Sequence, residues 1–130
     1  MELIFKNQYT EFSDKDVVDK IITLPYNEEA AAYLIYNRYH PLLFKIYRKI
    51  YDEDFSWYED CQGDLYDFLK GKNLDWQKLR SFEWRSHFST WIGRTANNRF
   101  LEIKPYLIGK IPNPISIDDD ESESGSVQLP

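Results

Sequence analysis

Apolar residues recur every three or four positions through most of this chain, the spacing of α-helices with one buried face. The first such pattern follows Asp14, a candidate N-cap, and stops at Pro25. Its members are Val17, Val18, Ile21 and Ile22. The sequence therefore predicts a short first helix between these two points.

A second, longer stripe begins after Asn27, whose side chain can cap a helix N-terminus, with Glu28 and Glu29 placed favourably against the helix dipole. The stripe comprises Ala31, Leu34, Ile35, Tyr39, Leu42, Leu43, Ile46 and Ile50. Pro41 lies inside it. Because proline lacks a backbone N–H, we expect the helix to kink or restart there.

A third helix is predicted near residues 57–70, after an acidic turn at residues 52–54. Its inward face would carry Cys61, Leu65, Phe68 and Leu69. We expect residues 71–75 to form a loop and residues 76–80 no more than a turn. Residues 81–89 are polar and aromatic without a regular period, which indicates a loop.

Helical spacing returns at Thr90 and continues to Pro105, which we expect to end the last helix. Its inward face would carry Trp91, Ile92, Ala96, Phe100 and Ile103. We therefore predict an all-α fold, a compact bundle of three to four helices over residues 1–110. Residues 111–130 have the composition of a disordered acidic C-terminal tail.

The charge is distributed unevenly along the 130 residues, although the net value is only −6. Residues 1–69 carry 7 basic and 14 acidic side chains, residues 70–110 carry 9 and 3, and residues 111–130 carry none and 5. Such segments suggest different partners for different surfaces. A basic patch can bind nucleic acid even in an acidic chain.

Several classes of protein are disfavoured by what the sequence lacks. There is no long uninterrupted apolar segment and no signal peptide, so we expect a cytoplasmic protein that does not enter the membrane. The single Cys61 excludes an internal disulfide, and with only His40 and His87 beside it we expect no metal site. Without a nucleophile–base pair or a phosphate-binding glycine loop, we expect neither an enzyme nor a cofactor.

Residues 80–100 interleave arginines with aromatic and short polar side chains. Guanidinium groups can neutralise phosphates and aromatic rings can stack on unpaired bases, so this segment is typical of binding to single-stranded or melted nucleic acid. The candidate DNA-binding residues are Arg80, Phe82, Arg85, Ser86, Phe88, Thr90, Arg94, Asn97, Asn98 and Arg99. The alternative is that Phe88, Trp91 and Phe100 are core residues and the arginines are solvated.

Asp60, Asp64 and Asp67 recur at steps of four and three, so they share one face of the third helix. Their mutual repulsion would be relieved by a basic partner, although a solvated acidic face is the alternative.

Three segments together resemble conserved region two of bacterial RNA polymerase sigma factors of the small extracytoplasmic-function type. They are residues 36–43 (YNRYHPLL), residues 59–66 (EDCQGDLY), and residues 82–102 with their Phe–Ser–Phe–Thr–Trp–Ile run and Ala-Asn-Asn. The resemblance covers roughly residues 27–104, most of the predicted bundle.

This resemblance implies a transcription-initiation domain that breaks no covalent bond. The third helix would dock on the clamp helices of the polymerase's largest subunit through Glu59, Asp60, Asp64 and Asp67. The segment over residues 80–99 would melt the promoter element just upstream of the start site and hold a non-template-strand base. A cognate anti-sigma protein is a further candidate partner.

The chain departs from the family at Gly63, where glutamine is usual, and at Lys70, where tryptophan is frequent. The family's arginine run after Asn98 is also missing, as is a second, helix-turn-helix domain. We therefore expect either one domain of a longer protein or a naturally short regulator. The rival function is a protein-interaction module without melting activity, its basic segment masked by an acidic partner or by its own tail.

Overall fold

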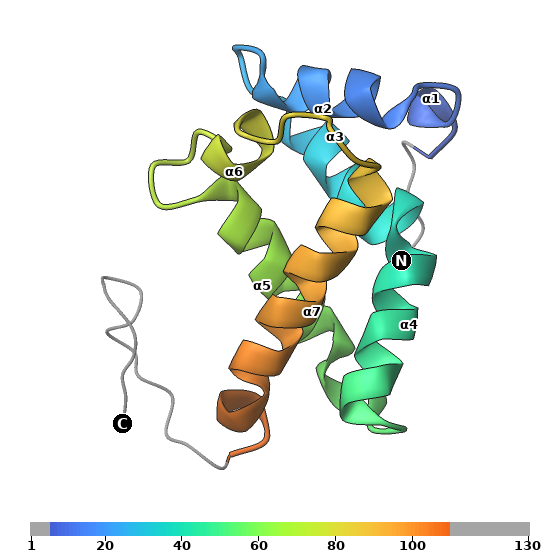
Figure 1. Cartoon of the computed structure of the whole chain (residues 1–130), viewed down its shortest axis with the longest axis vertical. Helices are drawn as coiled ribbons and strands as arrows, with labels where there is room; N and C mark the ends of the chain where they lie inside the picture. Colours follow the sequence, from blue (N-terminus) through green and yellow to red (C-terminus); the bar gives the residue numbers. More distant parts are fainter. Residues whose placement is uncertain (1–5, 110–130) are drawn as a thin grey trace.

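Helices alone make up the regular structure of residues 6–109, the part of the chain that the computed structural model describes (Figure 1). In chain order they are α1 (Lys6–Tyr9), α2 (Asp14–Ile22), α3 (Glu28–Tyr33), the π-helix η1 (Leu34–Arg38), α4 (His40–Tyr51), the 3-10 helix η2 (Phe55–Trp57), α5 (Tyr58–Lys70), α6 (Gln77–Arg80) and α7 (Phe88–Leu107). The all-α prediction is confirmed. The predicted acidic tail lies outside the described residues.

Helix α2 is capped by Ser13 and not, as expected, by Asp14. The Ser13 hydroxyl accepts a hydrogen bond of 3.1 Å from the backbone N–H of Asp16. The Asp14 carboxylate is instead bound by Arg38 at 2.8 Å and by the Tyr39 hydroxyl at 2.5 Å. Because these tertiary contacts occupy Asp14, the preceding serine takes the cap position.

The predicted second helix is divided into α3, η1 and α4. Asn27 caps α3 as expected, accepting a 3.0 Å hydrogen bond from the N–H of Ala30. The chain leaves helical geometry at Tyr39, and α4 starts again with Pro41 in its first turn. A proline there removes no intrahelical hydrogen bond, so the predicted restart is confirmed.

Helix α7 begins at Phe88 and runs through Pro105 to Leu107, so the prediction that this proline ends the helix is wrong. Pro105 removes only the N–H that would reach the carbonyl of Leu101, a residue on the exposed side of the helix. The last turn is also held from outside, because the Lys104 ammonium donates a 2.7 Å hydrogen bond to the backbone carbonyl of Ile50.

The core lies between α4, α5 and α7, with α1 and α2 across one end of these helices (Figure 1). Tyr47 and Tyr51 stack with their ring centres 4.4 Å apart, and the Tyr51 hydroxyl donates a 3.0 Å hydrogen bond to the carbonyl of Phe100. The latter bond joins α4 to α7. Each large apolar side chain buried here contributes about 2 kcal/mol to stability.

Candidate nucleic-acid interface

The loop between α6 and α7 has its own aromatic cluster. The Phe82 ring lies 4.8 Å from Trp84, 5.6 Å from Phe88 and 5.2 Å from Trp91, measured between ring centres. Trp84 has a left-handed backbone with φ of 63°, a conformation that the packed rings hold in place. The packing of these rings therefore holds the loop in a defined conformation, which was not evident from the sequence.

Phe88 lies at the bottom of this cluster and is only 3% exposed. Its ring also contacts Tyr39 at 5.7 Å, which connects the loop to the start of α4. A ring this buried has no free face for a base. The predicted contact of Phe88 with DNA is therefore revised. Phe88 supports the loop from within, in agreement with the alternative that it is a core residue.

A hollow of about 360 Å³ opens beside the loop, between α5, α6 and α7. It is lined by Phe68, Lys78, Ser81, Trp91, Thr95, Asn98, Arg99 and Glu102. Only Asn98 and Arg99 of these were among the predicted DNA-binding residues. The remainder come from three separate segments, and no spacing in the sequence indicates that they meet.

The cations of the hollow are positioned by the ring of Phe68. The Lys78 ammonium lies 4.6 Å and the Arg99 guanidinium 4.7 Å from its centre. Cation–π contacts of this kind hold long side chains in place. The hollow therefore combines the Lys78 ammonium and the Arg99 guanidinium with the Glu102 carboxylate, a partly exposed indole and the hydrogen-bonding groups of Ser81 and Asn98.

Arg99 is bound by carboxylates of its own chain. Its Nε and Nη2 donate to the two carboxylate oxygens of Asp64 at 2.9 and 3.0 Å, and its Nη1 to Glu102 at 3.1 Å. Burial opposes the charged form, but the bonds to Asp64 outweigh it and raise the pKa of Arg99. Two residues predicted to face different partners thus bind each other.

Arg80 and Arg85 are also engaged. Arg80 donates to the carbonyls of Ile22 at 3.2 Å and Asp75 at 2.8 Å, which connects α6 to the end of α2. Arg85 pairs with Glu83 at 3.1 Å in the exposed part of the loop. Arg80 therefore has a structural role in this conformation, whereas the pair at Arg85 can open to solvent.

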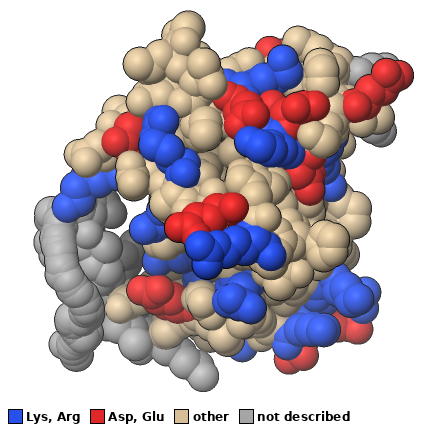
Figure 2. Space-filling view, turned by 45° about the horizontal axis from the view of Figure 1, so that its top comes forward, with Lys and Arg blue, Asp and Glu red and all other residues tan. Residues whose placement is uncertain are grey.

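Four other predicted DNA-binding residues, all exposed, lie outside the hollow. They are Ser86, Thr90, Arg94 and Asn97. Figure 2 shows basic and acidic side chains interspersed over the upper part of one face and a group of basic side chains at its lower right. This face therefore has local basic patches beside acidic side chains.

The acidic residues of α5 are not equivalent. Glu59, Asp60 and Asp67 are exposed, whereas Asp64 faces α7 and binds Arg99. Burial, together with the nearby charges of Asp67 and Glu59, raises the pKa of Tyr36, so these two carboxylates lie toward η1. Of the four predicted polymerase-binding residues, three are therefore exposed, and Asp64 is bound by Arg99.

Other kinds of site are not indicated over residues 6–109. No three His, Cys, Asp or Glu side chains gather there as a metal site would require, and no helix there is long and apolar enough to cross a membrane. No family model, curated protein or solved structure matches the chain. The resemblance to sigma region two therefore stays a prediction.

Proposed function

We propose that this domain acts in bacterial transcription initiation as a sigma-like module, binding the polymerase clamp helices and capturing bases of the non-template promoter strand. The observation that carries this proposal is the hollow beside the aromatic loop, which Trp91 lines together with Lys78 and several hydrogen-bonding groups. The domain would act in the cytoplasm, without a cofactor and without breaking a covalent bond.

An unpaired base in this hollow would stack on Trp91 and receive hydrogen bonds from Asn98 and Ser81. Lys78 would attract the adjoining phosphate. Glu102 repels phosphate but accepts hydrogen bonds from exocyclic amino groups, so we expect the base edge to face it. Extruding a base costs a few kcal/mol, which stacking worth about 1–3 kcal/mol and the hydrogen bonds can offset.

The polymerase would be bound through the exposed carboxylates of Glu59, Asp60 and Asp67 on α5. The family's partner surface is basic, and opposite charges give specificity and rapid association. Asp64 takes no direct part in this proposal because Arg99 already occupies its carboxylate. An anti-sigma protein covering the same carboxylates is a compatible further partner.

The strand-capture proposal is tested with two adjacent asparagines. Asn98 lines the hollow and Asn97 does not, although both are exposed. We expect Asn98→Ala to weaken binding of a fluorescent single-stranded promoter oligonucleotide by about fivefold or more, and Asn97→Ala to change it less than twofold. Equal losses in both variants, or none in either, would exclude the hollow as the base site.

The rival function is a protein-interaction module without melting activity. It is favoured by the internal bonds of Arg80 and Arg99, which leave fewer arginines for phosphates. Calorimetry with isolated clamp helices separates the two functions. Binding of the clamp helices without binding of promoter strands would support the rival, whereas binding of both supports the proposed function.

A further inference from the structure

The outer face of α4 carries a second group of cations that the predicted DNA-binding residues do not include. Lys45, Arg48 and Lys49 are exposed, and their side chains take part in none of the ion pairs or hydrogen bonds found in residues 6–109. The spacing of four residues places Lys45 and Lys49 on the same side of the helix. Three neighbouring cations outside any of these ion pairs favour an anionic ligand.

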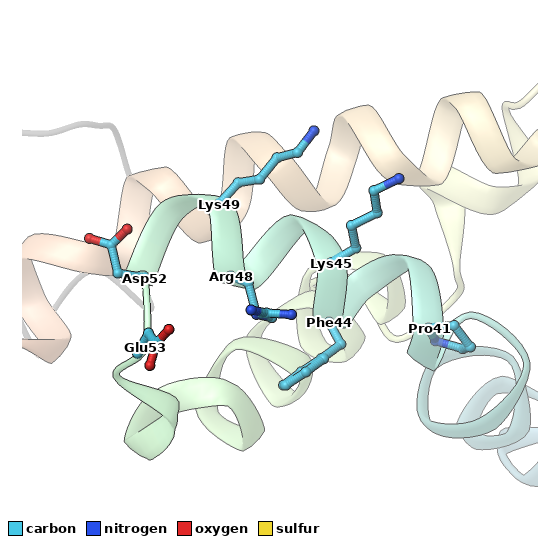
Figure 3. Close-up of a pocket in the computed structure, with 7 residues that line it drawn as sticks. All are labelled: Pro41, Phe44, Lys45, Arg48, Lys49, Asp52 and Glu53. Carbon is cyan, nitrogen blue, oxygen red and sulfur yellow. The ribbon is translucent and has the colours of Figure 1, made fainter.

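These cations surround an open groove of about 660 Å³ along α4. It is lined by Pro41, Phe44, Lys45, Arg48, Lys49, Asp52 and Glu53. Figure 3 shows Lys45 and Lys49 extending from one side of the helix and Phe44 and Arg48 from the other. Asp52 and Glu53 lie at the C-terminal end of α4, and their charges exclude phosphates from that end of the groove.

Phe44 in the groove stacks against the exposed ring of Phe55. Phe44 and Phe55 stack with ring centres 5.6 Å apart and an interplanar angle of 25°, and Phe55 is 48% exposed. A large apolar ring exposed beside arginine and lysine is a platform on which a base of any identity can stack. Such a platform favours single-stranded nucleic acid over a purely acidic protein segment, which has no flat ring to stack on it.

The groove also lies alongside α7. A Cβ atom placed on Gly93 would be 3.6 Å from Leu42 and 3.7 Å from Ile46, so the two helices are in close contact at this point. Arg94 follows Gly93 and is exposed. The basic surface of α4 is therefore close to the helix that carries the predicted DNA-binding residues.

We propose that the α4 groove is a second binding site for single-stranded DNA, with Lys45 and Lys49 on its phosphates and Phe55 stacked on a base. The proposal rests on the proposed function, since it assigns a path to more of the captured strand. The groove would hold a stretch of the strand beyond the base in the hollow, from the Pro41 end as far as Lys49.

The test compares two double variants of the full chain with the same change in net charge. Lys45→Gln/Lys49→Gln removes groove cations, whereas Lys20→Gln/Lys72→Gln removes exposed lysines from α2 and from the turn after α5. Binding of a fluorescent oligothymidine is measured by anisotropy over a range of salt concentrations. We expect the groove variant to bind about tenfold more weakly. The slope of its log affinity against log salt concentration should become shallower by about 1.4, because two phosphate contacts are lost, with little change in the control.

Stacking on Phe55 is tested separately with Phe55→Leu. This variant should bind oligothymidine about fivefold more weakly yet bind an abasic strand of the same length as well as the wild type does, because only the base contact is lost. Equal affinity of this variant and the wild type for oligothymidine would overturn the stacking contact.

Three results would overturn the groove itself. The groove variant could match its control, the wild type could bind no oligothymidine, or poly-glutamate could compete as well as DNA of equal length, which would indicate an acidic protein partner. Asn98→Ala in the same assay separates the two proposals. If that variant loses affinity and the groove variant does not, the proposed function stands and the groove is excluded.

Discussion

Asp64 on α5 and Arg99 on α7 form a two-point ion pair, with donor–acceptor distances of 2.9 and 3.0 Å across 35 positions of sequence. Their side chains are 24% and 21% exposed, so the pair is shielded from most of the solvent. The two residues fix the packing of α5 against α7 and place Arg99 over Phe68. This one contact therefore belongs both to the fold and to the hollow.

Removal of either partner should lower the free energy of unfolding by about 2 kcal/mol, because the other charge is then left partly buried. Urea unfolding of Asp64→Ala, Arg99→Ala and the double variant measures the coupling, which we expect to be about 1 kcal/mol or more. The 65% exposed Glu102 is the control, and Glu102→Ala should cost less than about 0.5 kcal/mol. Strict additivity of the two single changes would contradict the pairing.

Charge reversal should separate polymerase binding from folding. Asp60→Lys changes an exposed residue, and we expect it to abolish most binding to the clamp helices without a loss of stability, as read by calorimetry and thermal unfolding. Asp64→Lys should instead destabilise the fold, because it places a cation against Arg99. Glu11→Lys, on an exposed residue before α2, is the control for net charge and should bind normally.

Gly63 lies inside α5, and the space beside it admits a methyl group. An added Cβ would come no closer than 3.9 Å to the Tyr36 hydroxyl. Gly63→Ala should therefore raise the free energy of unfolding by about 1 kcal/mol, the difference in helix propensity. Gly71→Ala is the matched contrast, since φ of 81° there makes the same substitution unfavourable by about 1 kcal/mol. Stabilisation by both changes would show that helix propensity is not the cause.

Cys61 should make stability fall in alkaline solution. Burial, assisted by the charges of Asp64 and Asp60, raises the pKa of this thiol to about 12, against an ordinary value of 9.0. The folded state therefore holds the thiol proton more tightly than the unfolded state does. The resulting contribution of Cys61 to the free energy of unfolding is complete below pH 9 and is lost as the pH rises toward 12. Urea midpoints between pH 8 and about 11 measure the effect.

The control for this effect is Cys61→Ala, which should show a shallower decline over the same range. Buried tyrosines such as Tyr51, whose pKa is also raised by burial, contribute the remainder of the decline. A thiol reagent at pH 8 should react with Cys61 only as fast as the protein unfolds, because the side chain is fully buried. Rapid labelling of the folded protein would contradict both expectations.

The sequence by itself determined the features that depend on neighbouring residues. Apolar spacing predicted the all-α fold and the extent of α5, Asn27 marked the start of α3, and Pro41 marked the restart at α4, because each of these is decided within one or two helical turns. The caps and proline positions act through the backbone of adjacent residues, so they can be predicted without the rest of the molecule.

The tertiary structure alone decided the features that depend on distant residues. Pro105 stays within α7 although its local rule predicts a helix end, and the adjacent Lys104 holds the last turn to the carbonyl of Ile50. The hollow likewise arises only where α5, α6 and α7 meet, and Phe88 is buried because its neighbours in the loop fold over it. Such contacts depend on how helices pack against one another, which periodicity along one helix does not specify.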